Sequence, residues 1–160
     1  MNRIKRILAF VLIVALIPAL LTSCKKTPSD TEAFKKLSNA KGYVIYDVTE
    51  QYINAPQIKE ATIAAPSDKS FQIEFYIITD LDSTKELFMA QSEVMESTKG
   101  DSWSGNVSNG KNYAKRTLTT GGKYMVLSYI ENTMLYVPPT PTDNEDNLKA
   151  IDAFIDEFHY

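Results

Sequence analysis

Residues 113–137 read YAKRTLTTGGKYMVLSYIENTMLYV, and this stretch carries the clearest strand pattern of the chain. It contains three runs rich in β-branched and aromatic residues, separated by two short turn signals. The first turn, Thr120-Gly121-Gly122, suits a tight hairpin because glycine adopts a positive φ at no steric cost. Glu131-Asn132 supplies the second turn. The stretch therefore predicts three consecutive antiparallel strands, over 113–119, 123–130 and 133–137.

Two features of this stretch bear on burial and on where it ends. Met125-Val126-Leu127 places apolar side chains on alternate faces of the middle strand, so we expect that strand to be buried on both faces. Pro138, Pro139 and Pro141 follow the third run. Because proline cannot donate to a strand ladder, we expect the third strand to end at Val137.

The flanking sequence alternates between helical and strand patterns. Apolar spacing and capping residues predict helices over 31–39, 82–97 and 147–158. Gly42 ends the first helix, and Ser83 with Glu86 has the spacing of a capping box in the second. The negative residues of Thr142–Glu145 suit the start of the third.

Strand patterns before residue 82 predict three more strands. They cover 43–49, 62–65 and 70–78, and the turn 66–69 joins the last two. Alternation in the third of these strands predicts one solvated face. Gly100–Asn112 reads as a loop. The predicted order is α-βββ-α-βββ-α, an α+β fold with an antiparallel sheet and its helices packed on one face.

The first 24 residues predict an export signal followed by a lipidation site. Basic residues precede the 15-residue apolar run Ile7–Leu21, which at about 1.5 Å per residue is too short to span a bilayer core of roughly 30 Å. The run ends in Leu21-Thr22-Ser23-Cys24, which resembles the lipobox of bacterial lipoproteins. The resemblance implies cleavage after Ser23 and acylation of Cys24. Ordinary signal cleavage is the alternative, but it would place Leu21 where a small residue is preferred.

These features divide the chain into three parts. We expect a signal peptide over 1–23, a lipidated cysteine with a short polar tether over 24–30, and a single domain over 31–160. Two or more acyl chains on Cys24 would anchor the domain stably. The expected location is the extracytoplasmic face of the cell membrane.

Short motifs along the domain carry a second resemblance. They are the helix end Gly42-Tyr43, the strand residues Phe75-Tyr76, the turn Asn132-Thr133 and the last residue, Tyr160. In these the chain resembles small uncharacterised lipoproteins of low-GC Gram-positive bacteria. The resemblance implies no activity, because none is assigned to that group.

Charge and composition exclude several classes of partner. Removal of the signal would cost Arg3, Lys5 and Arg6 but none of the 20 acidic residues, so the mature chain is acidic. Nucleic-acid affinity comes largely from basic surfaces, so we expect no nucleic-acid partner. One cysteine excludes an intrachain disulfide, and one histidine argues against a histidine-built metal site. We expect no metal and no cofactor.

Trp103 and Tyr113 are the candidate binding residues. Trp103 is the one tryptophan of the chain and lies among the glycine, serine and asparagine residues of 100–112. Three interpretations of Trp103 are open: an anchor for a partner, a residue at a lipid interface, or a side chain that folds back over the sheet edge. Tyr113 opens the next strand. Tyrosines in strands serve as pleat-covering residues or as a carbohydrate- or peptide-binding face, and the sequence does not separate the two.

Residues suited to catalysis are few. His159 lies beyond the last predicted helix, where we expect fraying, and its position suits a cation near a helix C-terminus. Asp143–Asp146 lacks the glycine and glutamate positions of an EF-hand loop and is interpreted as helix capping. Glu74 is the acid on a polar strand face that a carboxylate-dependent hydrolase would use with a second acid.

The sequence therefore favours a non-enzymatic lipoprotein. We expect it to be held by lipid on Cys24 and to bind a protein, a peptide or a cell-wall polymer at the envelope. The alternatives are a small carboxylate-dependent envelope hydrolase and an accessory subunit of a membrane complex.

Overall fold

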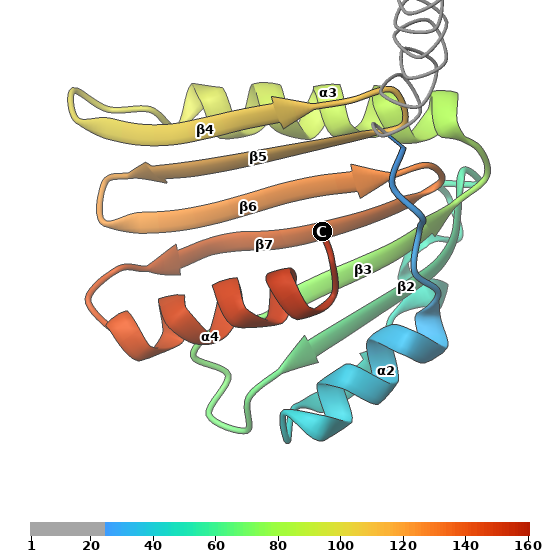
Figure 1. Cartoon of the computed structure of the whole chain (residues 1–160), viewed down its shortest axis with the longest axis horizontal. Coiled ribbons are helices and arrows are strands. Elements are labelled where there is room, and N and C mark those ends of the chain that lie inside the picture. The colour runs from blue at the N-terminus through green and yellow to red at the C-terminus, as the bar shows by residue number, and fades with distance from the viewer. Residues whose placement is uncertain (1–24) are drawn as a thin grey trace, which may run out of the picture.

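The computed structural model describes residues 25–160, and within this range the strands form one seven-stranded antiparallel sheet. The sheet order is β1-β2-β3-β7-β6-β5-β4 (Figure 1). The elements are α2 (Thr31–Ala40), β1 (Val44–Asp47), the 3₁₀-helix η1 (Thr49–Tyr52), β2 (Ile58–Ala65), β3 (Ile73–Ile78), α3 (Leu81–Ser97), β4 (Trp103–Asn109), β5 (Tyr113–Thr120), β6 (Lys123–Ile130), β7 (Thr133–Pro141) and α4 (Glu145–Glu157).

The three strands predicted from residues 113–137 are confirmed as the meander β5-β6-β7. Gly121 and Gly122 form the first turn with φ values of 55° and 70°, as the glycine signal predicted. β7 pairs with β3, the last strand before α3. The chain leaves β3 in the middle of the sheet, passes through α3 and enters β4 at the edge of the sheet. The strands β5, β6 and β7 then follow in order back to β3.

The α+β class is confirmed, but the predicted strand count is wrong by one. Residues 103–109, which we assigned to a loop, form β4, so the order is α-βββ-α-ββββ-α. The sequence WSGNVSN has little apolar content or β propensity of its own. It is extended because it pairs with β5 in seven consecutive residue pairs, from Trp103↔Thr120 to Asn109↔Ala114.

The helices cover both faces of the sheet, so the prediction that they share one face is wrong. In Figure 1, α2 and α4 lie in front of the sheet and α3 lies behind it. Val126 of β6 packs on the α2–α4 side, whereas its neighbours Met125 and Leu127 pack on the α3 side. The central strands are apolar on both faces, as predicted for β6, and each face requires its own cover.

The third meander strand does not end at Val137; β7 continues to Pro141. Val137 pairs with Val126, and Thr140 pairs with Tyr124, so Pro138 and Pro139 together lie opposite the single residue Met125. This irregularity is a bulge, and a bulge tolerates residues that cannot donate to the ladder. The bulge therefore accommodates Pro138 and Pro139 within β7, and they do not end the strand.

Helices α2 and α4 end in the same way. At the end of α2 the N–H of Gly42 donates to Asn39 O and the N–H of Tyr43 donates to Ser38 O. This is a Schellman motif, and the φ of 74° at Gly42 explains why glycine ends the helix. At the end of α4 His159 takes that position with a φ of 66°. Fraying there was a wrong expectation, because the following Tyr160 is only 3% exposed.

Helix α3 begins one residue earlier than predicted and uses a different cap. The Asp80 side chain accepts a hydrogen bond from Ser83 N at 2.8 Å, so the N-cap is Asp80 and not a Ser83–Glu86 capping box. This bond lowers the pKa of Asp80. In α4 the cap is Asn144, within the predicted capping segment.

Candidate functional site

Residues 25–30, which the sequence suggested as a tether, are bound to the domain. They cross the front of the sheet at the ends of the meander strands before entering α2 (Figure 1). The Asn112 side chain binds the backbone of Lys26 twice: Lys26 N donates to Asn112 Oδ1 at 3.1 Å, and Asn112 Nδ2 donates to Lys26 O at 2.7 Å. Asn112 is 3% exposed. Its amide therefore hydrogen-bonds the backbone of Lys26 through both a donor and an acceptor, as a neighbouring strand would.

Glu131 strengthens this attachment. Lys25 Nζ lies 3.1 Å from Glu131 Oε1, and Asn112 Nδ2 donates to the same oxygen at 3.2 Å. The Lys25 ammonium and then the Asn112 amide hold the pKa of Glu131 below its usual range. Glu131, in the turn between β6 and β7, thus provides the carboxylate that pairs with Lys25.

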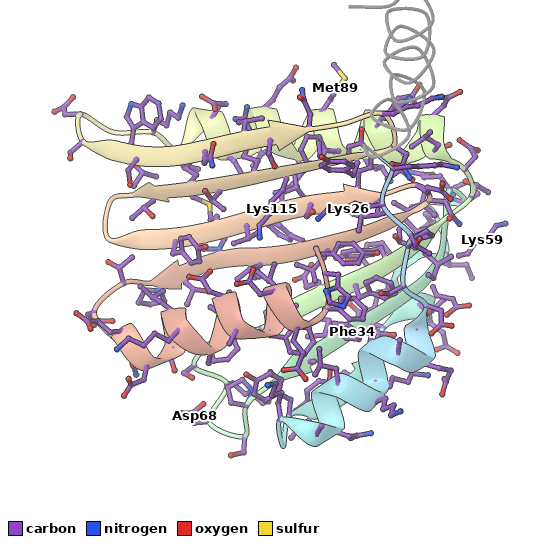
Figure 2. The ribbon with its side chains drawn as sticks, viewed as in Figure 1. Lys26, Phe34, Lys59, Asp68, Met89 and Lys115 are labelled. Carbon is purple, nitrogen blue, oxygen red and sulfur yellow. The ribbon has the colours of Figure 1, made fainter. Side chains whose placement is uncertain are left out.

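The side chain of Lys26 is bound to the domain as well as its backbone. Its Nζ donates to His159 O at 3.1 Å and lies 5.2 Å from the centroid of the Tyr113 ring. Lys26 and Lys115 project over the same part of the sheet (Figure 2). Burial, with the nearby charge of Lys26, lowers the pKa of Lys115, whose Nζ donates to Tyr160 O at 3.2 Å.

Tyr113, one of the two candidate binding residues, lies inside this attachment. Its ring packs against the core beneath α4 on one side and under Lys26 on the other. Gly110 approaches it closely, since a Cβ at Gly110 would fall 2.2 Å from the Tyr113 ring. In this structure Tyr113 holds the chain's own residues 25–30.

We expect Asn112→Ala to release residues 25–30 from the sheet. The variant loses both bonds to Lys26 and the bond to Glu131, so hydrogen exchange in this segment should be at least about tenfold faster. The free energy of unfolding should fall by about 1–3 kcal/mol, the usual cost of breaking buried hydrogen bonds. Exchange measured by mass spectrometry checks the first result, and urea unfolding checks the second. Asn109→Ala, which truncates an exposed asparagine of β4, should change neither.

Trp103 lies at the other end of β5 from Tyr113. It pairs with Thr120, the last residue of β5, whereas Tyr113 is the first. The structure therefore does not bring the two candidate residues together. Trp103 is 53% exposed and belongs to the edge strand itself, without folding back over it. Lys99 Nζ stands 3.4 Å from the centroid of its ring.

Three charged residues line a hollow beside Trp103: Glu96 of α3, Lys99 just after α3 and Arg116 of β5. Glu96 lies 2.6 Å from Lys99 Nζ and also pairs with Arg116, and these two cations, Lys99 first, lower the pKa of Glu96. Together with Trp103 and Val107 they line a small hollow of about 150 Å³ between α3 and β4. The hollow offers the Trp103 ring and the aliphatic side chains of Val107 and Leu118 inside a charged rim.

Glu74 belongs to a hydrogen-bonded network on the α3 face. Gln72 Nε2 donates to Glu74 Oε1 at 2.5 Å, and Tyr76 OH donates to Glu74 Oε2. Burial, and then the charge of Glu74, raise the pKa of Tyr76. Tyr76 is only 6% exposed, so the predicted solvated face of β3 is wrong: α3 lies across it. The hydrogen-bonding partners of Glu74 are an amide and a phenol, which suit a structural carboxylate.

The remaining acidic residues form no evident metal site. Within residues 25–160 no group of three His, Cys, Asp or Glu side chains is placed to hold a metal ion. Among the helices in this range, none has both the length and the apolar character needed to cross a membrane. Cys24 and the predicted signal 1–23 lie outside the described residues.

Sequence reasoning named Trp103 and Tyr113 as candidates, which stays a prediction, and did not name Asn112, which hydrogen-bonds the backbone of Lys26. Asn112 stands between Lys111 and Tyr113 with no spacing or motif that marks it. Its role follows from a contact 86 residues away in the chain. Searches for similar proteins found no matching family model, no matching curated protein and no matching solved structure.

Proposed function

We propose that this chain is a bacterial lipoprotein, anchored through acylated Cys24 on the extracytoplasmic face of the cell membrane. Its domain acts as a non-enzymatic module that binds a protein, a peptide or a cell-wall polymer. The observation that carries the proposal is the binding of Lys25 and Lys26 to the sheet, directly after the lipobox cysteine. Because residues directly after Cys24 are bound to the sheet, a lipid on Cys24 would fix the orientation of the domain relative to the membrane.

The attachment supports an orientation in which this end of the sheet faces the bilayer. Cys24 directly precedes Lys25 in the sequence, so a lipid on Cys24 would be attached one residue before the residue that pairs with Glu131. The same end carries the loop around Ile53. Thr79 N donates to Gln57 O in that loop, and Ile78 N donates to the O of Asn132, next to Glu131. Ile53 is 82% exposed, the largest exposure among the large apolar side chains of the described region.

Trp103 would face away from the membrane in this orientation. It stands at the opposite end of β4–β5 from Asn112, and eight residues of strand span about 26 Å. This placement favours a partner in the envelope over the lipid interface as the contact of Trp103. The hydrogen-bonding partners of Glu74 favour binding over hydrolysis.

The test measures which end of the domain lies near lipid. Acylated Cys24 carries no free thiol, so a single added cysteine can be labelled with a fluorophore in the full-length protein. Ile53→Cys reports the end near Lys25, and Ser67→Cys reports the turn between β2 and β3 at the other end. Lys59 and Asp68 in Figure 2 mark these two ends of β2. In vesicles containing nitroxide-headgroup lipid, the label at 53 should be quenched at least about threefold more than the label at 67.

Cys24→Ala is the matched control for the anchor. Where the signal is still removed from this variant, the processed protein should be found in the soluble fraction and not in the membrane fraction. Retention of processed Cys24→Ala protein in the membrane would refute the lipid anchor. Equal quenching at positions 53 and 67 would refute the fixed orientation.

A further inference from the structure

β4 is an edge strand without the features that usually protect a sheet edge. All seven of its residues are exposed, and it pairs with β5 without a bulge. Its sequence, WSGNVSN, contains no charged residue and no proline. Protected edges are short, charged, bulged or interrupted by proline, because an open edge pairs with other chains. The opposite edge strand, β1, has only four residues.

The outward hydrogen-bonding groups of β4 can be assigned by alternation. Gly110 N donates to Tyr113 O, and Asn106 N donates to the Thr117 hydroxyl, so even-numbered residues direct their N–H groups toward β5. In an antiparallel strand the next residues direct theirs the other way. The N–H and C=O groups that point outward therefore belong to Trp103, Gly105, Val107 and Asn109.

Side chains along this edge form a notch at Gly105. Trp103 and Val107 lie on the same face of β4 as Gly105 and are each 53% exposed. Gly105 between them has no side chain, and the hollow of about 150 Å³ lies there, with Leu118 of β5 in its lining. A strand added outside β4 would place the side chain opposite Gly105 beside this notch. An aliphatic side chain fits its apolar walls.

Two opposite charges bracket the edge. Asp101 precedes β4 and Lys111 follows it, and neither belongs to an ion pair in the described part of the chain. An antiparallel strand would begin beside Lys111 and end beside Asp101. An acidic first residue and a basic last residue would therefore complement the edge.

We propose that β4 binds an extended segment of another protein by antiparallel strand addition. The segment is uncharged over the length of β4, acidic at its start, basic at its end, and carries an aliphatic side chain opposite Gly105. Main-chain hydrogen bonds to the outward groups supply affinity, and the notch and the two charges supply specificity. This inference rests on the proposed function and names its class of partner.

A second copy of the chain fits this edge less well. Antiparallel pairing of two β4 strands would place Trp103 of one copy beside Asn109 of the other. The Lys25 attachments would then lie at opposite ends of the joined sheet, separated by about the 24 Å length of seven strand residues. Two copies anchored in one bilayer through a bound Lys25 cannot adopt this arrangement.

Trp103 makes the proposal directly measurable, because it is the one tryptophan of the chain. The probe is the peptide ETTVTLTTK, titrated into the full-length protein in detergent micelles while tryptophan emission is recorded. Its leucine aligns with Gly105 when the seven residues between its charged ends pair with β4. We expect a saturable blue shift as the added strand covers the ring.

Two control peptides test the register and the direction. The charge-swapped peptide KTTVTLTTE has the same composition and should bind about tenfold more weakly. The peptide ETTVTGTTK lacks the leucine that would lie opposite Gly105, and it should also bind about tenfold more weakly. No saturable shift with ETTVTLTTK, or equal affinity for all three peptides, would overturn the proposal.

A pair of variants tests the outward backbone groups. Val107→Pro removes one outward N–H without touching the bonds to β5, and it should weaken binding at least about tenfold. Val107→Thr keeps that N–H and alters only the side chain at the notch, so it should bind clearly more tightly than Val107→Pro. If Val107→Pro disturbs β4 itself, the three peptides on the unmodified chain still decide the question. Emission that shifts with protein concentration alone would show a second copy at the edge and would overturn the proposal.

The peptide titration and the anchoring test fail independently. Peptide binding is measured in micelles and needs no bilayer. Peptide binding together with membrane retention of processed Cys24→Ala protein would refute the anchor and leave the β4 site in place. Correct anchoring without peptide binding would refute the β4 site alone.

Discussion

Phe34→Ala is expected to lower the free energy of unfolding by about 3–5 kcal/mol, a large part of the 5–15 kcal/mol typical of a domain. Phe34 of α2 is fully buried. Its ring centroid lies 5.2 Å from that of Phe75 in β3 and 5.6 Å from those of Phe154 and Phe158, at the end of the chain. The substitution therefore leaves a cavity at the point where α2, the sheet and α4 meet (Figure 2).

Urea unfolding followed by circular dichroism measures this loss. Phe34→Leu keeps an apolar side chain and should cost clearly less than alanine. Met89→Ala is the matched control on a helix surface, because Met89 is 63% exposed and its loss should change stability by less than about 0.5 kcal/mol. Equal effects of Phe34→Ala and Met89→Ala would show that the aromatic cluster does not hold α2 on the sheet.

Alkaline pH is expected to destabilise the fold steeply, beginning near pH 10. Burial raises the pKa of Tyr160 to about 12, against a value near 10 in an unfolded chain. The stability that this buried phenol contributes is therefore complete below pH 10 and is lost as the pH rises toward 12. Two pKa units correspond to about 2.7 kcal/mol. Burial also raises the pKa of other tyrosines, which adds to the loss: Tyr43, Tyr76, Tyr124, Tyr129 and Tyr136.

Urea unfolding at intervals between pH 7 and pH 12 checks this expectation. Lys115 opposes it in part, because a lysine whose pKa is lowered by burial stabilises the fold more as the pH rises. Tyr160→Phe loses the hydroxyl bonded to Thr133 and should be slightly less stable at pH 7. It should also lose less stability between pH 10 and pH 12 than the unmodified chain. The same slope in both proteins would contradict the assignment to Tyr160.

Local signals were sufficient for the elements whose residues carry their own pattern. The hairpin at Gly121-Gly122 follows from glycine's freedom at positive φ, and the end of α2 at Gly42 follows from the same property. The helices followed from apolar spacing. Their exact caps did not, because Asp80 and Ser83 are both able to cap and only the backbone geometry chooses between them.

The candidate site was predictable in part. Trp103 and Tyr113 are large side chains beside a polar stretch, and that contrast marked them in the sequence. Their separation to opposite ends of β5 required the register of β4 and β5, which no local pattern in WSGNVSN contains. Asn112 carried no signal at all, because its function is a contact with the backbone of Lys26.

Local sequence patterns were enough to predict the α+β class, the meander of residues 113–137 and the three helices, because periodicity and turn residues act within a few residues of chain. The sequence also supports the lipobox expectation at Cys24, which remains a prediction. Tertiary structure alone decided four features: β4 as an edge strand, the helices on both faces, the bulge at Pro138-Pro139 and the attachment of Lys25-Lys26. Each depends on hydrogen bonds or burial between segments far apart in the chain, where pairing outweighs local preference.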